Sequence, residues 1–294
     1  LPMEVIRTVL QQAAQLGLST LSLSGGEPFL HPNIEEIMAV CSHLGLRELK
    51  VYTCGIVLGA GQVAPLGTDS VVTAKQAGAT LVFNIQSTQV DVCDRLSGRI
   101  GRFDVAMASL RKAIDCGIPV ECHIVPNKIN LDSLSDTAHQ LLDMGVKRVS
   151  FLRLVPQGNA VDNWACLGLD QEDLAQLRAL LGQLHSEPQS ECKYRFGVPF
   201  SEVSSLGQTC QAGISKVLVR WDGLCFPCEA FKECGDGSFA IGNILVNTVA
   251  EILCEARGNW RLQTLKTLSR EEDVCPAQAL YSKAMSREGV RVGV

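Results

Sequence analysis

The sequence TLSLSGGEP at residues 20–28 decides the fold of this 294-residue chain. It begins as a short apolar, strand-like run and ends at Gly25 and Gly26, which let a ligand approach the backbone without a Cβ in the way. Glu27 adds a carboxylate that accepts hydrogen bonds from an ammonium group, and Pro28 stiffens the exit from the turn. The stretch therefore predicts a strand that ends in a binding edge for a small amine. An ordinary strand-to-loop turn is the alternative.

The alternation of a short β-rich run with a longer helical segment continues to about residue 155, which predicts an α/β domain with a parallel sheet. We expect strands at residues 21–24, 49–53, 81–86, 120–125 and 149–155, and helices near residues 4–16, 34–44, 103–116, 131–144 and 170–185. Gly17, Gly45, Gly117 and Gly145 each stand where one of these helices would end. Because the chain opens on a helix, we expect one further strand and its loop upstream of Leu1, giving about six βα units in all.

Polar or glycine-bearing groups follow every expected strand. Parallel strands in a closed or partly closed barrel bring these groups to one rim, where such folds bind their ligands. The groups are residues 25–27, 53–55, 86–88, 126–128 and 156–159. Five such groups, each directly after an expected strand, favour a binding rim over residues that only turn the chain.

The composition excludes several classes of partner. A net charge of -5 gives no basic surface for nucleic acid or an anionic membrane, and no apolar run approaches the length of a membrane span. The five histidines have no metal-ligand spacing among themselves, so we expect structural roles for them. We expect a cytoplasmic protein.

The thirteen cysteines are many for such a chain, and those after about residue 191 are grouped. A chain with ample core uses clustered thiols for metal binding or catalysis more readily than for a disulfide framework. An Asp222-Gly223 turn predicts a β-hairpin that brings Cys228 near Cys210. The candidate metal ligands are Cys210, Cys225, Cys228, Cys234 and Cys275. Their spacing suits a tetrahedral zinc or an iron–sulfur cluster, and spacing alone does not choose between them.

Both halves of the chain together resemble the radical S-adenosylmethionine (radical SAM) superfamily. The resemblance rests on residues 24–28, Thr53-Cys54-Gly55, and Asp94-Arg95-Leu96-Ser97-Gly98 followed by Gly101-Arg102-Phe103. In the tail, Cys210-Gln211-Ala212-Gly213, Pro227-Cys228 and Ile241-Gly242-Asn243-Ile244 are similar to the auxiliary-cluster extension called SPASM, or its shortened twitch form. The implied fold is a partial (β/α)6 barrel at residues 1–190, without its first strand, followed by a small Cys-rich domain at residues 191–294.

The resemblance also implies the cofactors and the site. Its cofactors would be S-adenosylmethionine, a catalytic [4Fe–4S] cluster with ligands upstream of this chain, and one auxiliary [4Fe–4S] cluster. The amino group of S-adenosylmethionine would lie at residues 25–28. The other cofactor-binding candidates are Thr53, Gln86, Ser87 and Asn127 at strand ends, and Gln157 in the turn that would border the adenine. No residue is assigned a catalytic role.

The chain departs from the family pattern in two places. The Cys-x3-Cys-x2-Cys motif of the catalytic cluster is absent from the 294 residues, so we expect the chain by itself to be inactive. A complete SPASM extension carries a late Cys-x2-Cys-x5-Cys-x3-Cys run. Of that run this chain has only Cys275, and Gln278 occupies a position where a second cysteine would fall. One auxiliary cluster is therefore expected, held by Cys210, Cys228 and Cys275 with a fourth thiol from Cys192, Cys225 or Cys234.

The implied function is reductive cleavage of S-adenosylmethionine to a 5′-deoxyadenosyl radical that modifies a peptide, a protein side chain or a small metabolite. A flavodoxin or ferredoxin would supply the electron. The alternative function is a catalytically degenerate S-adenosylmethionine-binding or scaffold protein whose tail holds a structural zinc or iron–sulfur cluster.

Overall fold

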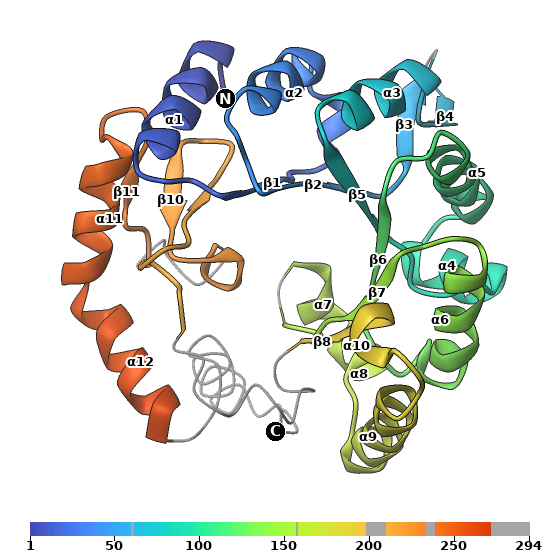
Figure 1. The fold of residues 1–294 in the computed structure, drawn as a ribbon. Coiled ribbons are helices and arrows are strands. Elements are labelled where there is room, and N and C mark those ends of the chain that lie inside the picture. Colours follow the sequence, from blue (N-terminus) through green and yellow to red (C-terminus); the bar gives the residue numbers. More distant parts are fainter. Residues whose placement is uncertain (60–61, 157, 198–209, 233–238, 272–294) are drawn as a thin grey trace. The chain divides into compact units, whose positions relative to one another are not determined.

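The computed structural model describes residues 1–59, 62–156, 158–197, 210–232 and 239–271 (Figure 1). By compactness the chain divides into two units, each of which is discontinuous in sequence. The first unit contains Leu1–Gly17, Val155–Gln171 and Ser201–Val294, and the second contains Leu18–Leu154 and Glu172–Phe200.

The second unit is built on a six-stranded sheet in the order β1-β2-β5-β6-β7-β8, in which every neighbouring pair is parallel. The strands are β1 (Thr20–Leu23), β2 (Glu48–Thr53), β5 (Ala79–Asn84), β6 (Val120–Ile124), β7 (Arg148–Phe151) and β8 (Tyr194–Phe196). Five of them confirm the strands predicted from the sequence, with ends that differ by a few residues. The parallel α/β architecture is therefore confirmed.

Helices cover the convex side of this sheet (Figure 1). They are α2 (Ile34–Ser42), α3 (Thr68–Gln76), α4 (Val90–Ser97), α5 (Arg102–Asp115), α6 (Leu134–Asp143), α9 (Gln171–His185) and α10 (Ser190–Lys193), with 3-10 turns η1 (Pro28–Leu30) and η2 (Leu131–Ser133). The buried side chains of Val51, Phe83 and Cys122 share one face, because Val51 pairs with Leu81, two residues before Phe83, and Phe83 pairs with Cys122. The alternation of side chains along each strand separates a helix-covered apolar face from a second face that carries polar residues. Gly17, Gly45, Gly117 and Gly145 all have positive φ, as the expected helix ends require.

Several elements of the second unit were not predicted. A two-stranded antiparallel hairpin, β3 (Ile56–Gly59) and β4 (Gln62–Pro65), follows β2 directly. Helix α3 is mostly polar and buries only Val71 and Ala74, so its sequence has little helical periodicity. Strand β8 is three residues long and follows a four-residue helix, which makes it too short to stand out from its surroundings.

The first unit is small and mixed. Its helices are α1 (Met3–Gln15), α7 (Asn159–Asp162), α8 (Trp164–Leu167), α11 (Val249–Gly258), α12 (Trp260–Glu271) and the 3-10 turn η3 (Glu229–Phe231). Its antiparallel sheet has the order β11-β10-β9, with β9 (Leu218–Val219), β10 (Leu224–Phe226) and β11 (Gly242–Asn243). The predicted Asp222-Gly223 hairpin turn is confirmed between β9 and β10. Gly223 has φ +89°, and a Cβ on it would lie 2.5 Å from Asn243 Oδ1, so only glycine fits there.

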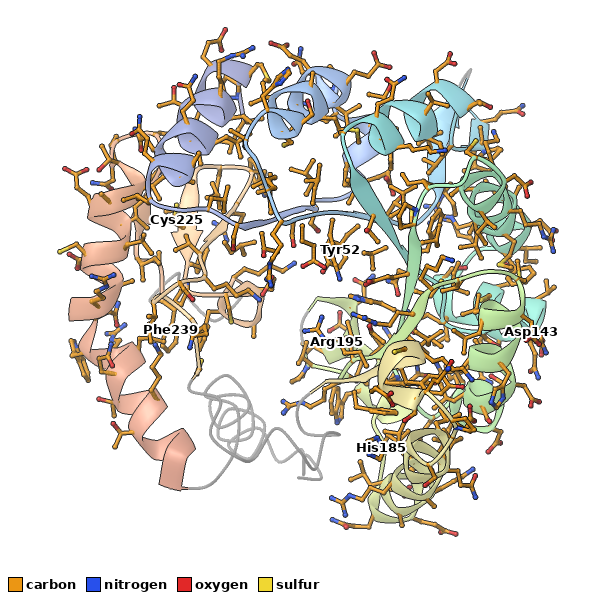
Figure 2. The ribbon with its side chains drawn as sticks, viewed as in Figure 1. Tyr52, Asp143, His185, Arg195, Cys225 and Phe239 are labelled. Atoms are coloured by element: carbon orange, nitrogen blue, oxygen red, sulfur yellow. The ribbon has the colours of Figure 1, made fainter. Side chains whose placement is uncertain are left out.

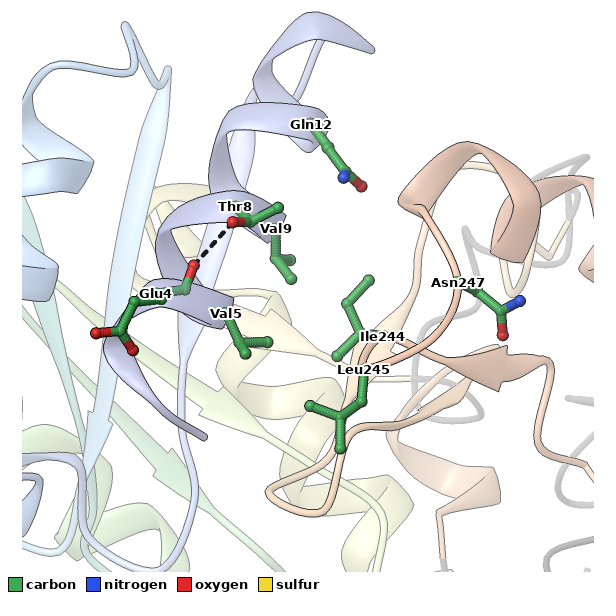
Figure 3. A pocket seen from close by; sticks show the side chains of 8 residues that line it. All are labelled: Glu4, Val5, Thr8, Val9, Gln12, Ile244, Leu245 and Asn247. Carbon is green, nitrogen blue, oxygen red and sulfur yellow. Dashed lines mark hydrogen bonds between the residues drawn. The ribbon is translucent and has the colours of Figure 1, made fainter.

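A shallow apolar pocket lies within the first unit, between α1 and the loop after β11 (Figure 3). Val5 and Val9 of α1 face Ile244 and Leu245 across it. The main-chain N–H of Val249 donates to Gln12 Oε1 at 2.9 Å. These contacts join the first helix of the chain to the start of α11. Among the described residues, no helix is both long enough and apolar enough to cross a bilayer.

Candidate functional site

Glu27 joins the carboxyl ends of β1 and β2. Its Oε1 accepts the Thr53 hydroxyl proton at 2.8 Å and the Phe29 N–H at 3.3 Å. Its Oε2 accepts the main-chain N–H of Cys54 at 2.9 Å and the Cys54 thiol at 3.1 Å. Thr53 Oγ1 in turn accepts the Gly55 N–H at 2.9 Å. Residues 27 and 53–55, which the sequence placed on one rim, therefore lie together.

The carboxylate of Glu27 is fully used by these contacts. Two carboxylate oxygens accept about four hydrogen bonds in total, and Glu27 already accepts four from Phe29, Thr53 and Cys54. Burial, followed by the hydrogen bond and charge of Glu27, raises the pKa of the Cys54 thiol to about 11, so the thiol stays a donor. The Glu27 side chain is therefore a clamp between two strand ends.

Gly25 and Gly26 leave open space beside that clamp. Both are exposed, and a Cβ built on either one meets no atom of the described chain within 4 Å. Gly25 has φ +145°, which strains any other residue. Pro28 is buried and begins η1, which fixes the exit of the turn. The turn is rigid on its protein side and open on the other.

The ends of β5 and β6 are held together by amide and hydroxyl groups. The Val125 N–H donates to Gln86 Oε1 at 2.8 Å. Ser87 is fully buried, and its hydroxyl lies 3.1 Å from Ser133 Oγ. Asn127 is buried and uses its side chain within its own loop, donating to the Val125 carbonyl at 2.9 Å and accepting from the Ile129 N–H at 3.0 Å. Of these predicted site residues only Gln86 is partly exposed. Gln157 lies outside the described residues.

Asn130 supports this rim, although the sequence did not single it out. It is fully buried, and its Nδ2 donates to the Gln86 carbonyl at 3.0 Å and to the Val125 carbonyl at 3.1 Å. Its Oδ1 accepts the Asn127 N–H at 2.8 Å. The signal available in the sequence was the pair Asn127 and Asn130 in the loop after β6, because asparagine side chains often hydrogen-bond the main chain of such loops.

The concave face of the same sheet carries a buried polar group that sequence reasoning also missed. Lys50 Nζ of β2 lies 2.7 Å from Glu121 Oε2 of β6, and Arg148 of β7 lies 4.0 Å from the same carboxylate. The Tyr52 and His123 rings lie 5.3 Å apart. Burial, followed by the charges of Lys50 and Arg195, lowers the pKa of His123 to about 4, so the ring is neutral near pH 7. The signal was the alternation of polar and apolar residues along β6.

Three described cysteines of the first unit pack in two separate apolar clusters. Cys225 is fully buried among Ile241, Ile252 and Ala256. Cys210 and Cys228 instead pack against the cluster that contains Phe226, Phe231, Phe239 and Leu262. Burial raises the pKa of the Cys225 thiol to about 11. This placement favours Cys210 and Cys228 over Cys225 as ligands.

Within the part of the chain that the structure describes, no three His, Cys, Asp or Glu side chains are grouped closely enough to hold a metal ion. Cys234 and Cys275 of the predicted ligand set lie outside the described residues.

A parallel sheet covered by helices on one side, with a glycine-bearing turn at the end of its first strand, defines an α/β protein of the partial-barrel class. The Radical SAM superfamily model matches residues 1–149, which is half of the chain. The chain therefore belongs to the Radical SAM superfamily. Membership implies S-adenosylmethionine and a [4Fe–4S] cluster as cofactors.

Two curated relatives are a peptide cyclase and a maturation protein by name. The chain is 27% identical over 230 residues to "PqqA peptide cyclase" of Ruegeria pomeroyi, covering 78% of this chain and 59% of that protein. It is 24% identical over 256 residues to "Sporulation killing factor maturation protein SkfB" of Bacillus subtilis, covering 85% of this chain and 56% of that protein. The chain thus spans less than two thirds of the length of either relative.

Solved structures share the fold. SuiB of Streptococcus suis bound to S-adenosylmethionine superposes with a TM-score of 0.66 at 18% identity, covering 86% of this chain and 58% of SuiB. SuiB bound to its precursor peptide SuiA gives 0.65 at 17% identity, with the same coverage. The protein anSMEcpe with bound AdoMet and a Cp18Cys peptide gives 0.68 at 14% identity, covering 90% of this chain and 75% of that one. These likenesses support the partial-barrel fold.

Proposed function

We propose that this chain forms the S-adenosylmethionine-binding core of a radical SAM enzyme that modifies a peptide. The observation that carries the proposal is the open Gly25-Gly26 turn beside the saturated Glu27 clamp. Relatives named for a peptide cyclase and for a killing-factor maturation protein support a peptide substrate over a small metabolite.

The residues of the rim have distinct roles in this proposal. Main-chain carbonyls of residues 24–26 receive the amino group, because the Glu27 carboxylate has no acceptor left. Thr53 holds Glu27 in place. Gln86 contacts the ligand, whereas the buried Ser87 and Asn127 act by fixing the loops that present it. Gln157 borders the adenine.

The residues of this chain do not supply ligands for the catalytic cluster. No Cys-x3-Cys-x2-Cys motif occurs among the 294 residues. The chain's own contribution is to bind S-adenosylmethionine, orient it and exclude water. Flavodoxin or ferredoxin as electron donor and a cytoplasmic location are parts of the proposal.

We also propose one auxiliary [4Fe–4S] cluster in a tail domain at residues 191–294, after a core at residues 1–190. Cys210 and Cys228 are the described ligand candidates, with Cys234 and Cys275 completing the set. The shared apolar cluster around Cys210 and Cys228 supports this choice, and the separate burial of Cys225 makes that residue part of the core instead.

The test is production of 5′-deoxyadenosine. The complete open reading frame that encodes this chain is expressed, reconstituted anaerobically with iron and sulfide, reduced, and supplied with S-adenosylmethionine. We expect 5′-deoxyadenosine by chromatography and mass spectrometry, with no product when the reductant is omitted. Tight binding of S-adenosylmethionine without any cleavage would instead support the degenerate scaffold, and no binding at all would refute both functions.

A further inference from the structure

Three polar side chains form one row across neighbouring strands of the parallel sheet. His123 of β6 is the register partner of Ser150 of β7, and Ser150 is the register partner of Arg195 of β8. All three lie on the concave face, because their sequence neighbours Cys122, Val149 and Phe151 are buried on the helix side. Figure 2 shows Arg195 and Tyr52 on this concave face.

Two members of the row are buried and have no hydrogen-bond partner. His123 is 9% exposed and Ser150 is fully buried, and neither His123 Nε2 nor Ser150 Oγ has a partner among the described residues. A buried polar atom without a partner loses its hydrogen bonds to water without replacing them, so such atoms usually mark a ligand contact or a source of strain. Here two of them lie on adjacent strands at the same level of the sheet.

Arg195 adds a cation at the end of the row. The neighbouring cation Lys50 is already paired, lying 2.7 Å from Glu121 and 3.3 Å from Glu48. Arg195 is exposed, and no carboxylate in the described part of the chain lies within ion-pair distance of it. The row therefore combines one unpaired guanidinium, one hydroxyl and one imidazole, three groups that can all donate to an anion.

We propose that His123, Ser150 and Arg195 form a carboxylate-binding site that recognises an acidic residue, glutamate or aspartate, in the peptide substrate. This inference rests on the proposed function for the peptide. The carboxylate accepts from the Arg195 guanidinium, the Ser150 hydroxyl and the His123 Nε2–H tautomer, and the Tyr52 ring covers the neighbouring side of His123.

S-adenosylmethionine has a carboxylate of its own. Its amino group is assigned to the turn after β1, three strand spacings from β6 and four from β7 in the order β1-β2-β5-β6-β7. The affinity for S-adenosylmethionine, measured for every variant beside the peptide preference, distinguishes the carboxylate of the cofactor from that of the peptide.

The test compares two labelled pentapeptides, acetyl-Ala-Ala-Glu-Ala-Ala-amide and its Gln counterpart, for binding to the 294-residue chain by fluorescence anisotropy. We expect the Glu peptide to bind at least about tenfold more tightly, as hydrogen bonds to a charged group imply. Arg195→Gln should remove this preference and Arg195→Lys should restore part of it. Ser150→Ala and His123→Gln should each weaken the preference severalfold. Arg178→Gln, an exposed arginine on α9 of the same unit, is the matched control and should keep the full preference.

The affinity for S-adenosylmethionine is measured for every variant by calorimetry, and far-UV circular dichroism with thermal unfolding verifies folding. Unchanged affinity for S-adenosylmethionine together with lost Glu preference in Arg195→Gln supports the site. Equal or absent binding of the two peptides to the wild type overturns it. Weaker S-adenosylmethionine binding with intact Glu preference in Arg195→Gln also overturns it, since the carboxylate would then belong to the cofactor. Failure to form 5′-deoxyadenosine would refute the proposed function but leave the peptide preference measurable.

Discussion

Glu27 at the end of β1 and Thr53 at the end of β2 are joined by a hydrogen bond of 2.8 Å in which the Thr53 hydroxyl donates to Glu27 Oε1. The same hydroxyl oxygen accepts the Gly55 N–H, so one side chain fixes two loops of the rim. The Gly25-Gly26 turn is therefore shaped by a residue from the neighbouring strand.

Thr53→Val should destabilise the fold and weaken ligand binding. It removes the donor to Glu27 and leaves the Gly55 N–H without its acceptor, which should cost about 1–3 kcal/mol in the free energy of unfolding. Urea denaturation measures the stability, and calorimetry with S-adenosylmethionine measures the binding. Thr267→Val on the exposed surface of α12 is the control and should change stability by less than about 0.5 kcal/mol. Equal effects of the two substitutions would contradict the clamp.

Gly26→Val should abolish S-adenosylmethionine binding without affecting folding. A Cβ on Gly26 meets no chain atom within 4 Å and its φ is not positive, so only an approaching ligand would be excluded. Gly182→Val on α9 is matched, because that glycine also has open space and no positive φ. We expect a loss of at least about tenfold in affinity for Gly26→Val and none for Gly182→Val. Normal binding by Gly26→Val would remove the turn from the site.

Lys50→Met should destabilise the second unit strongly. It leaves the Glu121 carboxylate, which lies 2.7 Å from Lys50 Nζ, buried without its main partner. Breaking a buried pair from one side costs about 3–5 kcal/mol, whereas replacing both partners by apolar groups costs much less. The double variant Lys50→Met with Glu121→Leu should therefore recover stability in urea denaturation. Additive losses would show that the two residues act independently.

Acid should destabilise the wild type through His123. The unfolded imidazole titrates near 6.5 and the folded one near 4, because burial and the charges of Lys50 and Arg195 disfavour the imidazolium. The unfolded state therefore binds more protons in this window, and stability falls as the pH drops from about 6.5 to about 4. The full loss is about 3 kcal/mol at about 1.4 kcal/mol per pKa unit.

His123→Asn should remove this component of the acid sensitivity. The exposed His43→Asn variant should retain it. The measurement is urea denaturation at about pH 7 and about pH 4.5, because most of the expected loss in stability falls between these two pH values. Identical pH dependence of the wild type and His123→Asn would contradict the assignment.

Cys225→Ala should lower thermal stability without changing the amount of bound iron, whereas Cys228→Ala should lower the amount of bound iron. Cys225 is fully buried among apolar residues, so its truncation should lower stability by about 1–2 kcal/mol and leave bound iron unchanged. Cys228→Ala should lower the iron bound per chain after anaerobic reconstitution. Iron analysis together with thermal unfolding separates the two effects. Equal iron loss in both variants would return Cys225 to the ligand set.

Much of the fold could be predicted from the sequence because it depends on local patterns. The alternation that marks β6 and the glycines that end the helices act within a few residues. Strand β8 could not be predicted, since Tyr194–Phe196 becomes a strand only by pairing with β7, more than forty residues earlier. The hairpin at β3 and β4 was hidden for a similar reason, because its short, mixed runs have little pattern of their own.

The candidate site was predictable in its location but not in its roles. Residues 25–28 were placed at a strand end from glycine and proline chemistry alone. That the Glu27 carboxylate is saturated depends on the position of Cys54, which only the pairing of β1 with β2 fixes. Likewise, the row of His123, Ser150 and Arg195 depends on strand register, which one sequence does not reveal.

The contact between Gln12 and the main chain at Val249 has a consequence for biosynthesis. These residues are 237 positions apart, and ribosomes add about 5–20 residues per second, so α1 waits about 10–50 s for its partner. During that time Val5 and Val9 have no core to join, since Ile244 and Ile252 are not yet synthesised. The nascent chain thus exposes Val5 and Val9 on one face of α1 to chaperones until α11 has been translated.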